Sequence, residues 1–172
     1  MFNKFSKLLP LFILLLSLTA CLTAESKTLY DYRTQYVGDN SKTVNLVSQL
    51  HFGESLDYDH TAIKSEDNLN ILELYFTSES EEVNDELKLS LFKANATLHA
   101  LIENLDQIDI YINSEKSYTT DKKEIESRGI FLKNFDEYFS SEEYYYEFEN
   151  ELKEIEMGNL NKLSMNSGEK SR

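Results

Sequence analysis

The strongest constraint on the fold is an apolar stripe that recurs through the middle of the chain at helical spacing. Its members repeat every three or four residues (Val83, Leu87, Leu91, Ala94, Leu98, Leu101 and Leu105). Side chains spaced in this way lie on one face of an α-helix, and that face must be buried against another element. The sequence therefore predicts a long helix over about residues 81–104 that packs on the rest of the domain.

Strands are predicted on both sides of this helix. Residues 107–113 alternate between apolar and polar side chains, which is the pattern of a strand with one buried face, and residues 117–120 can pair beside them. Residues 55–64 and 69–76 are expected to form a second strand pair, joined by a turn at 65–68. The second member of that pair is nearly all apolar at its end, as is typical of a central strand.

Capping residues predict shorter helices around this centre. The turn at 38–41 starts a helix that ends at 51–53, Asp121 caps a second helix, and a last helix begins near Ser141. Residues 29–34 are expected to form a short strand. One face of a further helix is expected to carry three aromatic side chains (Phe131, Phe135 and Tyr138).

The order of these elements predicts an α+β fold in a single domain. A small antiparallel sheet is expected to pack against the long helix, with shorter helices at its flanks. We assign this domain to residues 29–157 and expect the polar stretch at 158–172 to be a flexible tail.

The first twenty residues have the composition of an export signal. Two lysines precede an apolar run over 8–18, which is shorter than the roughly twenty residues that a membrane-spanning helix needs. The tetrapeptide Leu18-Thr19-Ala20-Cys21 resembles the lipobox of bacterial lipoproteins. The resemblance implies that the signal is cut before Cys21 and that the Cys21 thiol receives a diacylglycerol.

This interpretation divides the N-terminal part into a lipoprotein signal peptide at 1–20 and a lipidated tether at 21–28. The protein is then expected at the cell membrane, on its extracytoplasmic face, held by the lipid on Cys21. Two alternatives remain: Cys21 is an ordinary residue near the cut of a general secretory signal, or it is part of an uncleaved anchor. Cys21 is the only cysteine, so it cannot form an internal disulfide.

The charge of the chain limits its partners. Removing the signal and its two lysines leaves 15 basic and 31 acidic residues, a formal charge of −16. Nucleic acid is excluded as a partner, because its binding requires lysine and arginine to neutralise phosphates. An anionic membrane surface should also repel the domain, which leaves anchoring to the lipid.

Two segments resemble a known bacterial family. The run Tyr36-Val37-Gly38-Asp39-Asn40-Ser41-Lys42, just before an apolar helix, is similar to the opening motif of domain of unknown function 4825. The segment Ala94 to Ile112, especially His99 to Asp106, resembles a second part of that family, and the likeness extends from Leu29 to about Phe139. The resemblance implies an extracytoplasmic domain, usually on lipoproteins. It also implies a relation to domains attached to membrane-bound sensor metallopeptidases, which suggests a role in sensing or regulation. It implies no catalytic residues.

No recognisable catalytic pattern appears in the sequence. His51, His60 and His99 are far apart and show no His-Glu-x-x-His spacing, and there is no glycine-rich phosphate loop. We therefore predict no enzyme, no metal site and no cofactor. The acidic loop at 54–67 is the alternative, because its carboxylates could offer oxygens to calcium although they lack the full calcium-loop pattern (Glu54, Asp57, Asp59 and Asp67).

An aromatic cluster near the C-terminus is the predicted binding surface. Three consecutive tyrosines (Tyr144, Tyr145 and Tyr146) cannot all face the core from one helix, so at least one should be exposed. Tyrosine is enriched at binding surfaces, and Tyr144, Tyr146 and Phe139 are the residues proposed for contact. The alternative is that Tyr145 packs inward while the other two only cover the neighbouring surface.

These observations predict a non-enzymatic binding or regulatory domain that contacts another cell-envelope component. The contact would use an exposed aromatic surface or a strand edge. The alternative function is a solute- or cation-binding lipoprotein with its site in the loop at 54–67.

Overall fold

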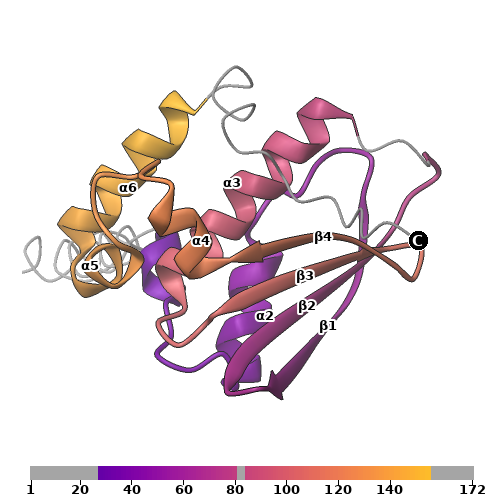
Figure 1. The fold of residues 1–172 in the computed structure, drawn as a ribbon, viewed down its shortest axis with the longest axis horizontal. Helices are drawn as coiled ribbons and strands as arrows, with labels where there is room; N and C mark the ends of the chain where they lie inside the picture. Colours follow the sequence, from indigo (N-terminus) through magenta and orange to yellow (C-terminus); the bar gives the residue numbers. More distant parts are fainter. Residues whose placement is uncertain (1–26, 81–83, 156–172) are drawn as a thin grey trace, which may run out of the picture.

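The chain folds into a four-stranded sheet with its helices gathered beside it (Figure 1). The computed structural model describes residues 27–80 and 84–155. Its elements are the 3-10 helix η1 (Leu29–Tyr32), α2 (Asn40–Ser48), β1 (Asp57–Glu66), β2 (Leu69–Thr77), α3 (Asp85–Leu101), β3 (Gln107–Ile112), β4 (Glu115–Asp121), α4 (Lys122–Ser127), α5 (Phe135–Ser140) and α6 (Glu142–Glu154). The predicted α+β class is confirmed.

The centre of the sheet differs from the prediction. The strands lie in the order β1-β2-β3-β4, and both outer pairs are antiparallel, but β2 and β3 are parallel, with Glu73 opposite Asp109. The prediction of an antiparallel sheet is therefore wrong for this pair. The reason is α3, which carries the chain back across the sheet, so that β3 starts from the same end as β2.

Two-residue turns close both hairpins. Asp67 and Asn68 join β1 to β2, and Asn113 and Ser114 join β3 to β4, with φ between 51° and 69° at all four residues. Such turns match the twist of the flanking strands, and Asn and Asp adopt positive φ more readily than most residues. The strands consequently run closer to the turns than the sequence pattern predicted.

Helix α3 is the centre of the core. The side chain of Asn84 accepts a hydrogen bond from the backbone of Leu87 at 2.8 Å and caps the start of the helix. The predicted stripe is confirmed from Leu87 to Leu101, whereas Leu105 is buried in the loop after the helix and Val83 lies outside the described residues. The stripe packs with apolar residues of the sheet (Leu72, Leu74, Phe76, Ile108, Ile110 and Ile112).

An aromatic layer covers the other side of α3. Phe92 of α3 stacks on Phe131 with ring centroids 6.5 Å apart, and Phe131 lies 5.1 Å from Phe148 of α6. The prediction that Phe131 is helical is wrong, because α5 begins only at Phe135. Its ring nevertheless packs with Phe135 and Tyr138, as predicted. Only the helical backbone predicted for Phe131 is absent.

The remaining boundaries agree with the capping pattern. Asp39 caps α2, Asp121 caps α4 and Ser141 caps α6 through side-chain hydrogen bonds to backbone N–H groups. The strand predicted at 29–34 is instead the 3-10 helix η1, followed by an isolated bridge between Thr34 and Ile102.

The predicted N-terminal and C-terminal segments lie largely beyond the described part of the chain. The signal peptide at 1–20, most of the tether with Cys21, and the tail at 158–172 are among the residues that the structure does not describe. Within the described ranges, no helix has both the length and the apolar character that crossing a membrane requires.

A buried polar contact lies between α3 and the end of the sheet. His99 is fully buried, and its Nε2 lies 3.5 Å from the hydroxyl of Thr120, which also accepts a hydrogen bond from Asn95 at 3.2 Å. Burial lowers the pKa of His99 from 6.5 to about 3, and the positive charge of Lys122 adds to this effect. The native protein therefore holds His99 neutral.

This burial predicts an acid-sensitive fold. Between pH 6.5 and about 3, the unfolded chain protonates His99 and the native chain does not, so the free energy of unfolding falls as the pH falls. One proton contributes a slope of up to about 1.4 kcal/mol per pH unit. Denaturant titrations at a series of pH values from 7.5 downward measure this dependence. The free energy of unfolding should depend less steeply on pH in His99→Leu than in the unchanged chain. The exposed control His51→Gln should keep the pH dependence of the unchanged chain. Parallel profiles for His99→Leu and the unchanged chain would contradict this account.

Candidate functional site: a polar network on the open face of the sheet

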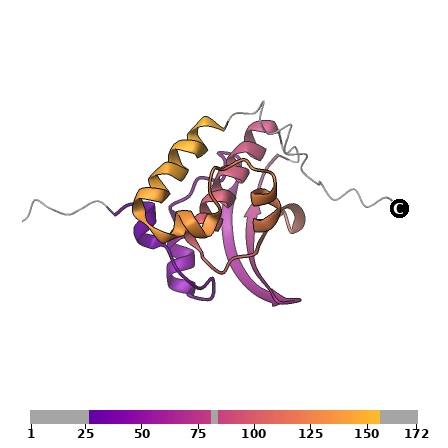
Figure 2. The same cartoon turned by 60° about the vertical axis from the view of Figure 1, so that its left-hand side comes forward.

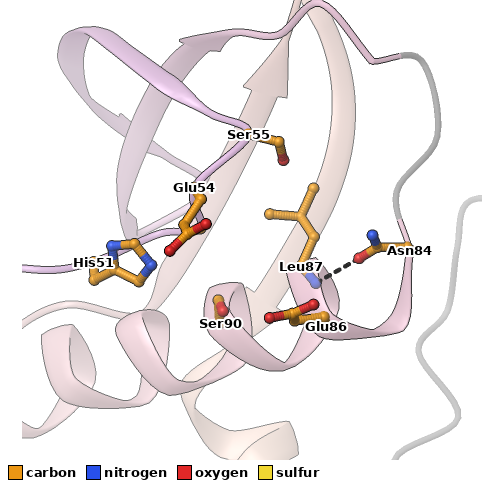
Figure 3. A pocket seen from close by; sticks show the side chains of 8 residues that line it. His51, Glu54, Ser55, Asn84, Glu86, Leu87 and Ser90 are labelled. Carbon is orange, nitrogen blue, oxygen red and sulfur yellow. Dashed lines mark hydrogen bonds between the residues drawn. The ribbon is translucent and has the colours of Figure 1, made fainter.

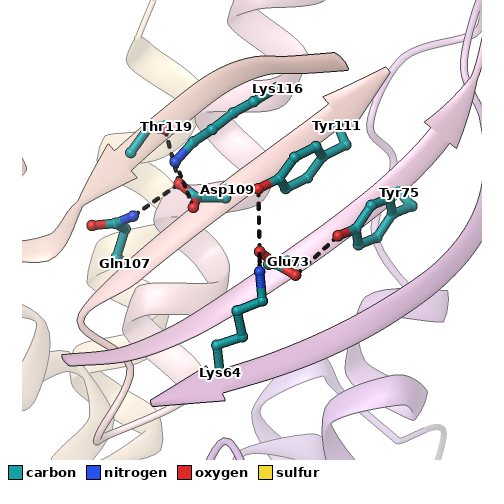
Figure 4. A network of polar contacts seen from close by, with 8 residues as sticks. All are labelled: Lys64, Glu73, Tyr75, Gln107, Asp109, Tyr111, Lys116 and Thr119. Carbon is teal, nitrogen blue, oxygen red and sulfur yellow. Dashed lines mark hydrogen bonds and ion pairs between the residues drawn. The ribbon is translucent and has the colours of Figure 1, made fainter. Parts of the chain in front are cut away.

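The face of the sheet opposite the helices carries a polar network (Figure 4). Alternate residues of each strand point away from the core, and those opposite one another in register share this outer face. We call this surface the polar face, and it consists of side chains from all four strands (His60, Lys64, Glu73, Tyr75, Gln107, Asp109, Tyr111, Lys116 and Thr119).

Glu73 of β2 is the first of two acids at the centre of the polar face. Its side chain is only 2% exposed, although it lies on the open side of the sheet. Its two oxygens accept three hydrogen bonds (from Lys64 Nζ at 2.6 Å, Tyr75 Oη at 2.9 Å and Tyr111 Oη at 3.2 Å). The donors themselves reach the solvent, since the Lys64 side chain is 53% exposed.

Asp109 of β3 is the second acid, directly opposite Glu73 across the parallel strands. Its side chain is 5% exposed, and it too accepts three hydrogen bonds (from Lys116 Nζ at 2.7 Å, Gln107 Nε2 at 2.9 Å and Thr119 Oγ1 at 2.9 Å). Each buried acid thus has its own lysine and two neutral donors. Because the two ion pairs balance, the carboxylates can lie on neighbouring strands without an uncompensated charge.

Three aromatic rings form a ladder across the polar face. His60 of β1 stacks on Tyr75 of β2 with ring centroids 4.2 Å apart, and Tyr75 stacks on Tyr111 of β3 at 4.6 Å. The ring planes differ by 7° and 10°, so the rings lie nearly parallel to one another. Most ring faces are occupied by this stacking, which leaves ring edges and the outer ends of the ladder for contact with other molecules.

Hydrogen bonding and burial in the network shift the pKa values of Glu73, Tyr75 and Tyr111. Burial alone would raise the pKa of Glu73, but its hydrogen bonds to Lys64 and the two tyrosines outweigh burial and lower that pKa. Burial and the carboxylate of Glu73 raise the pKa of both Tyr75 and Tyr111. The tyrosines therefore stay protonated and donate, and Glu73 stays ionised and accepts. This arrangement fixes the positions of Lys64, Tyr75 and Tyr111 around one carboxylate.

The residues predicted to form one aromatic binding surface lie on different sides of α6 and α5. Tyr145 is buried, while Tyr144 and Tyr146 are exposed on opposite flanks of the helix, and Phe139 is half-buried at the end of α5. Lys133 lies over the ring of Tyr144 at 4.9 Å, whereas the hydroxyl of Tyr146 donates to Glu142 at 3.2 Å. Tyr144 and Tyr146 therefore do not form one contact surface.

The prediction of an acidic loop at 54–67 is wrong, because most of this segment is strand β1 (Asp57–Glu66), and only its start lines a small cavity (Figure 3). The cavity, of about 240 Å³, lies between the loop after α2 and the start of α3, and His51, Glu54, Glu86 and Ser90 are among its lining residues. Of the four predicted carboxylates, only Glu54 lines it. No group of three potential metal ligands occurs among the residues that the structure describes.

Ser90 and Lys93 of α3 have a Ser-x-x-Lys spacing, which the sequence analysis overlooked when it found no catalytic pattern. Ser90 lines the cavity beside Glu54, but Lys93 lines a different cavity, together with Leu29 and Tyr145. The spacing therefore does not bring a serine and its lysine into one site.

Sequence reasoning also missed Glu73 and Asp109. A signal existed, because each acid interrupts an apolar strand, in Leu72-Glu73-Leu74 and in Ile108-Asp109-Ile110. Such interruptions indicate only that a side chain leaves the core. That the two acids meet depends on the parallel pairing of β2 and β3, which local sequence patterns do not reveal.

Comparison with known proteins gives one match. A family model described as Domain of unknown function (DUF4825) matches residues 29–126, which is more than half of the chain. The matched segment runs from η1 into α4 and includes the whole polar face, whereas α5 and α6 lie outside it. No curated protein and no solved structure matches the chain significantly.

The network predicts a specific loss of stability when its central charge is removed. Glu73→Gln keeps the shape of the side chain but replaces charge-assisted hydrogen bonds, so it should lower the free energy of unfolding by about 1 to 2 kcal/mol at pH 7. The native pKa of Glu73 lies below its ordinary value of 4.5, so this difference is present above pH 4.5 and disappears as the pH falls through the native pKa.

Denaturant titrations of Glu73→Gln measure this difference, and Glu66→Gln is the matched control. Glu66 lies at the exposed end of β1, so its substitution should change the free energy of unfolding by less than about 0.5 kcal/mol. Equal effects of the two substitutions would show that burial of Glu73 has no energetic consequence.

Proposed function

This chain belongs to the DUF4825 family, and we propose that it is a non-enzymatic binding or regulatory domain at the extracytoplasmic face of the cell membrane. In this proposal a lipid on Cys21 anchors the chain, and the domain contacts another component of the cell envelope. The anchor is supported by the tetrapeptide Leu18-Thr19-Ala20-Cys21 and by the short apolar run before it.

The burial of two acids at the centre of an exposed sheet face supports the binding function most. Removing a charged group from water costs free energy, and well-packed apolar residues often give equal or greater stability than a buried ion pair. Glu73 and Asp109 are therefore poorly explained by stability alone. They do order two lysines, two tyrosines, a glutamine and a threonine into one rigid surface.

The proposed partner is a protein. Tyrosine edges, lysine ammonium groups and a half-exposed histidine are suited to the mixed polar and aromatic surface of a protein interface. The two lysines neutralise the two acids within the polar face, so a partner meets less repulsion there than on the rest of a strongly acidic domain.

A solute-binding lipoprotein is the second candidate, and the cavity beside Glu54 favours it. Two acids, a histidine and two serines are among the residues that line that cavity, which suits a small polar or basic solute. A solute that binds there should raise the midpoint of thermal unfolding, and Glu54→Gln should abolish the rise. The polar face has no part in this candidate, so the two functions make separate predictions.

Anchoring is tested by replacing the lipidated residue. Cys21→Ala should abolish incorporation of labelled palmitate and leave the protein unprocessed or released from the membrane, because no other cysteine can carry the lipid. The measurement is metabolic labelling followed by fractionation of membranes, with the unchanged chain beside it. Labelling that persists in Cys21→Ala contradicts the lipobox interpretation.

Partner binding is tested by crosslinking in intact cells, pull-down of the anchored protein and mass spectrometry. We expect one saturable envelope protein, whose capture is lost in His60→Glu, because this substitution puts a negative charge at the outer end of the aromatic ladder. Asn45→Glu adds the same charge on the exposed side of α2 and should leave capture intact. Equal capture by both variants would exclude the polar face, and no enriched partner would favour the solute-binding candidate.

A further inference from the structure

The described chain begins beside α5 and α6. Figures 1 and 2 both show the first described residues next to these two helices. The hydroxyl of Tyr30 in η1 donates to the carbonyl of Phe139 at 3.2 Å, and the ring of Tyr30 lies 5.7 Å from that of Tyr145. The point at which the tether joins the domain is therefore fixed against the C-terminal helices.

Aromatic and basic side chains surround this point. We call the surface the tether face, and it consists of Lys27, Tyr32, Arg33, Phe139 and Tyr146. Lys27 lies over the ring of Tyr32 at 5.8 Å, and Arg33 lies over the ring of Tyr30 at 3.9 Å. Tyr146 is 46% exposed, and its hydroxyl donates to Glu142 of α6 at 3.2 Å.

The length of the tether limits how the domain can be oriented. Lys27 follows Cys21 by six residues, which span at most about 20 Å when fully extended. A domain of this size has a radius of gyration of about 14 Å and thus a diameter of roughly 35 Å. The tether is shorter than the domain is wide, so a lipid on Cys21 keeps the tether face turned toward the bilayer.

We propose that the tether face rests on the phospholipid headgroups, with Tyr146 and Phe139 in contact with the membrane interface. This inference rests on the proposed lipid anchor at Cys21. Tyrosine suits the interface because its ring is apolar and its hydroxyl is polar, and Lys27 and Arg33 can meet lipid phosphates. Asp31 and Glu142 lie beside them and oppose deep insertion into an anionic surface, so the contact is shallow.

This orientation leaves the polar face accessible. The turn between β3 and β4 lies on the side of the molecule away from α5 and α6 in Figure 1. The far ends of the strands then point away from the membrane. Tyr146 and Phe139 are thereby assigned to the membrane rather than to a protein partner.

The chain has no tryptophan, so single tryptophan substitutions can report which face meets the lipid. Tyr146→Trp and Phe139→Trp place the reporter on the tether face. Tyr58→Trp is the matched control, because Tyr58 is also exposed but packs against Phe76, which is paired with Ile112 just before the β3–β4 turn. Each full-length lipidated protein is reconstituted into vesicles of phosphatidylcholine and phosphatidylglycerol, with and without bromine on the upper acyl chains.

We expect brominated lipid to quench the tryptophan at positions 146 and 139 and to leave the one at position 58 unquenched. Flotation of the same vesicles distinguishes loss of the lipid anchor from loss of the contact between the tether face and the membrane. Protein that floats with the vesicles but shows no quenching at positions 146 and 139 would overturn the tether-face inference and leave the anchor intact. Quenching at position 58 alone would overturn it as well. Protein that fails to float would overturn the anchor and this inference together.

Discussion

The burial of α3 between the sheet and the aromatic layer is the constraint on which the rest of the structure depends. One side of the helix packs on Leu72, Leu74 and the isoleucines of β3, and the other packs on the aromatic layer of α5 and α6. Because α3 also connects β2 to β3, its course makes the central strands parallel. That pairing brings Glu73 and Asp109 together, so the polar face is a consequence of the crossover helix.

Local sequence patterns predicted most of the elements because each depends on neighbouring residues. The α3 stripe, the caps at Asp39 and Asp121, and the hairpin turns are of this kind. Strand pairing is not local, so the sequence reasoning assumed antiparallel strands and did not place the two acids side by side. Phe131 shows the same limit, since its ring joins the predicted aromatic cluster from a non-helical segment.

The polar face and the tether face account for the exposed aromatic residues in different ways. On the polar face, stacking and hydrogen bonds to buried acids fix Tyr75 and Tyr111, so their positions are set before any partner arrives. On the tether face, the hydroxyl of Tyr146 donates an exposed hydrogen bond to Glu142, and the side chain is 46% exposed. A rigid surface suits specific recognition of a protein. Exposed tyrosine suits contact with lipid headgroups, because its ring is apolar and its hydroxyl is polar.

The most direct test of the central claim, that the polar face is covered by a partner in the cell, is the reactivity of a thiol placed on it. A lipid on the Cys21 sulfur leaves an introduced cysteine as the only free thiol. His60→Cys should react with a membrane-impermeant maleimide more slowly in intact cells, at whose surface the reagent reaches the protein, than in the purified protein. Asn45→Cys should react at the same rate in both samples. Equal rates for His60→Cys in cells and in purified protein would contradict the account.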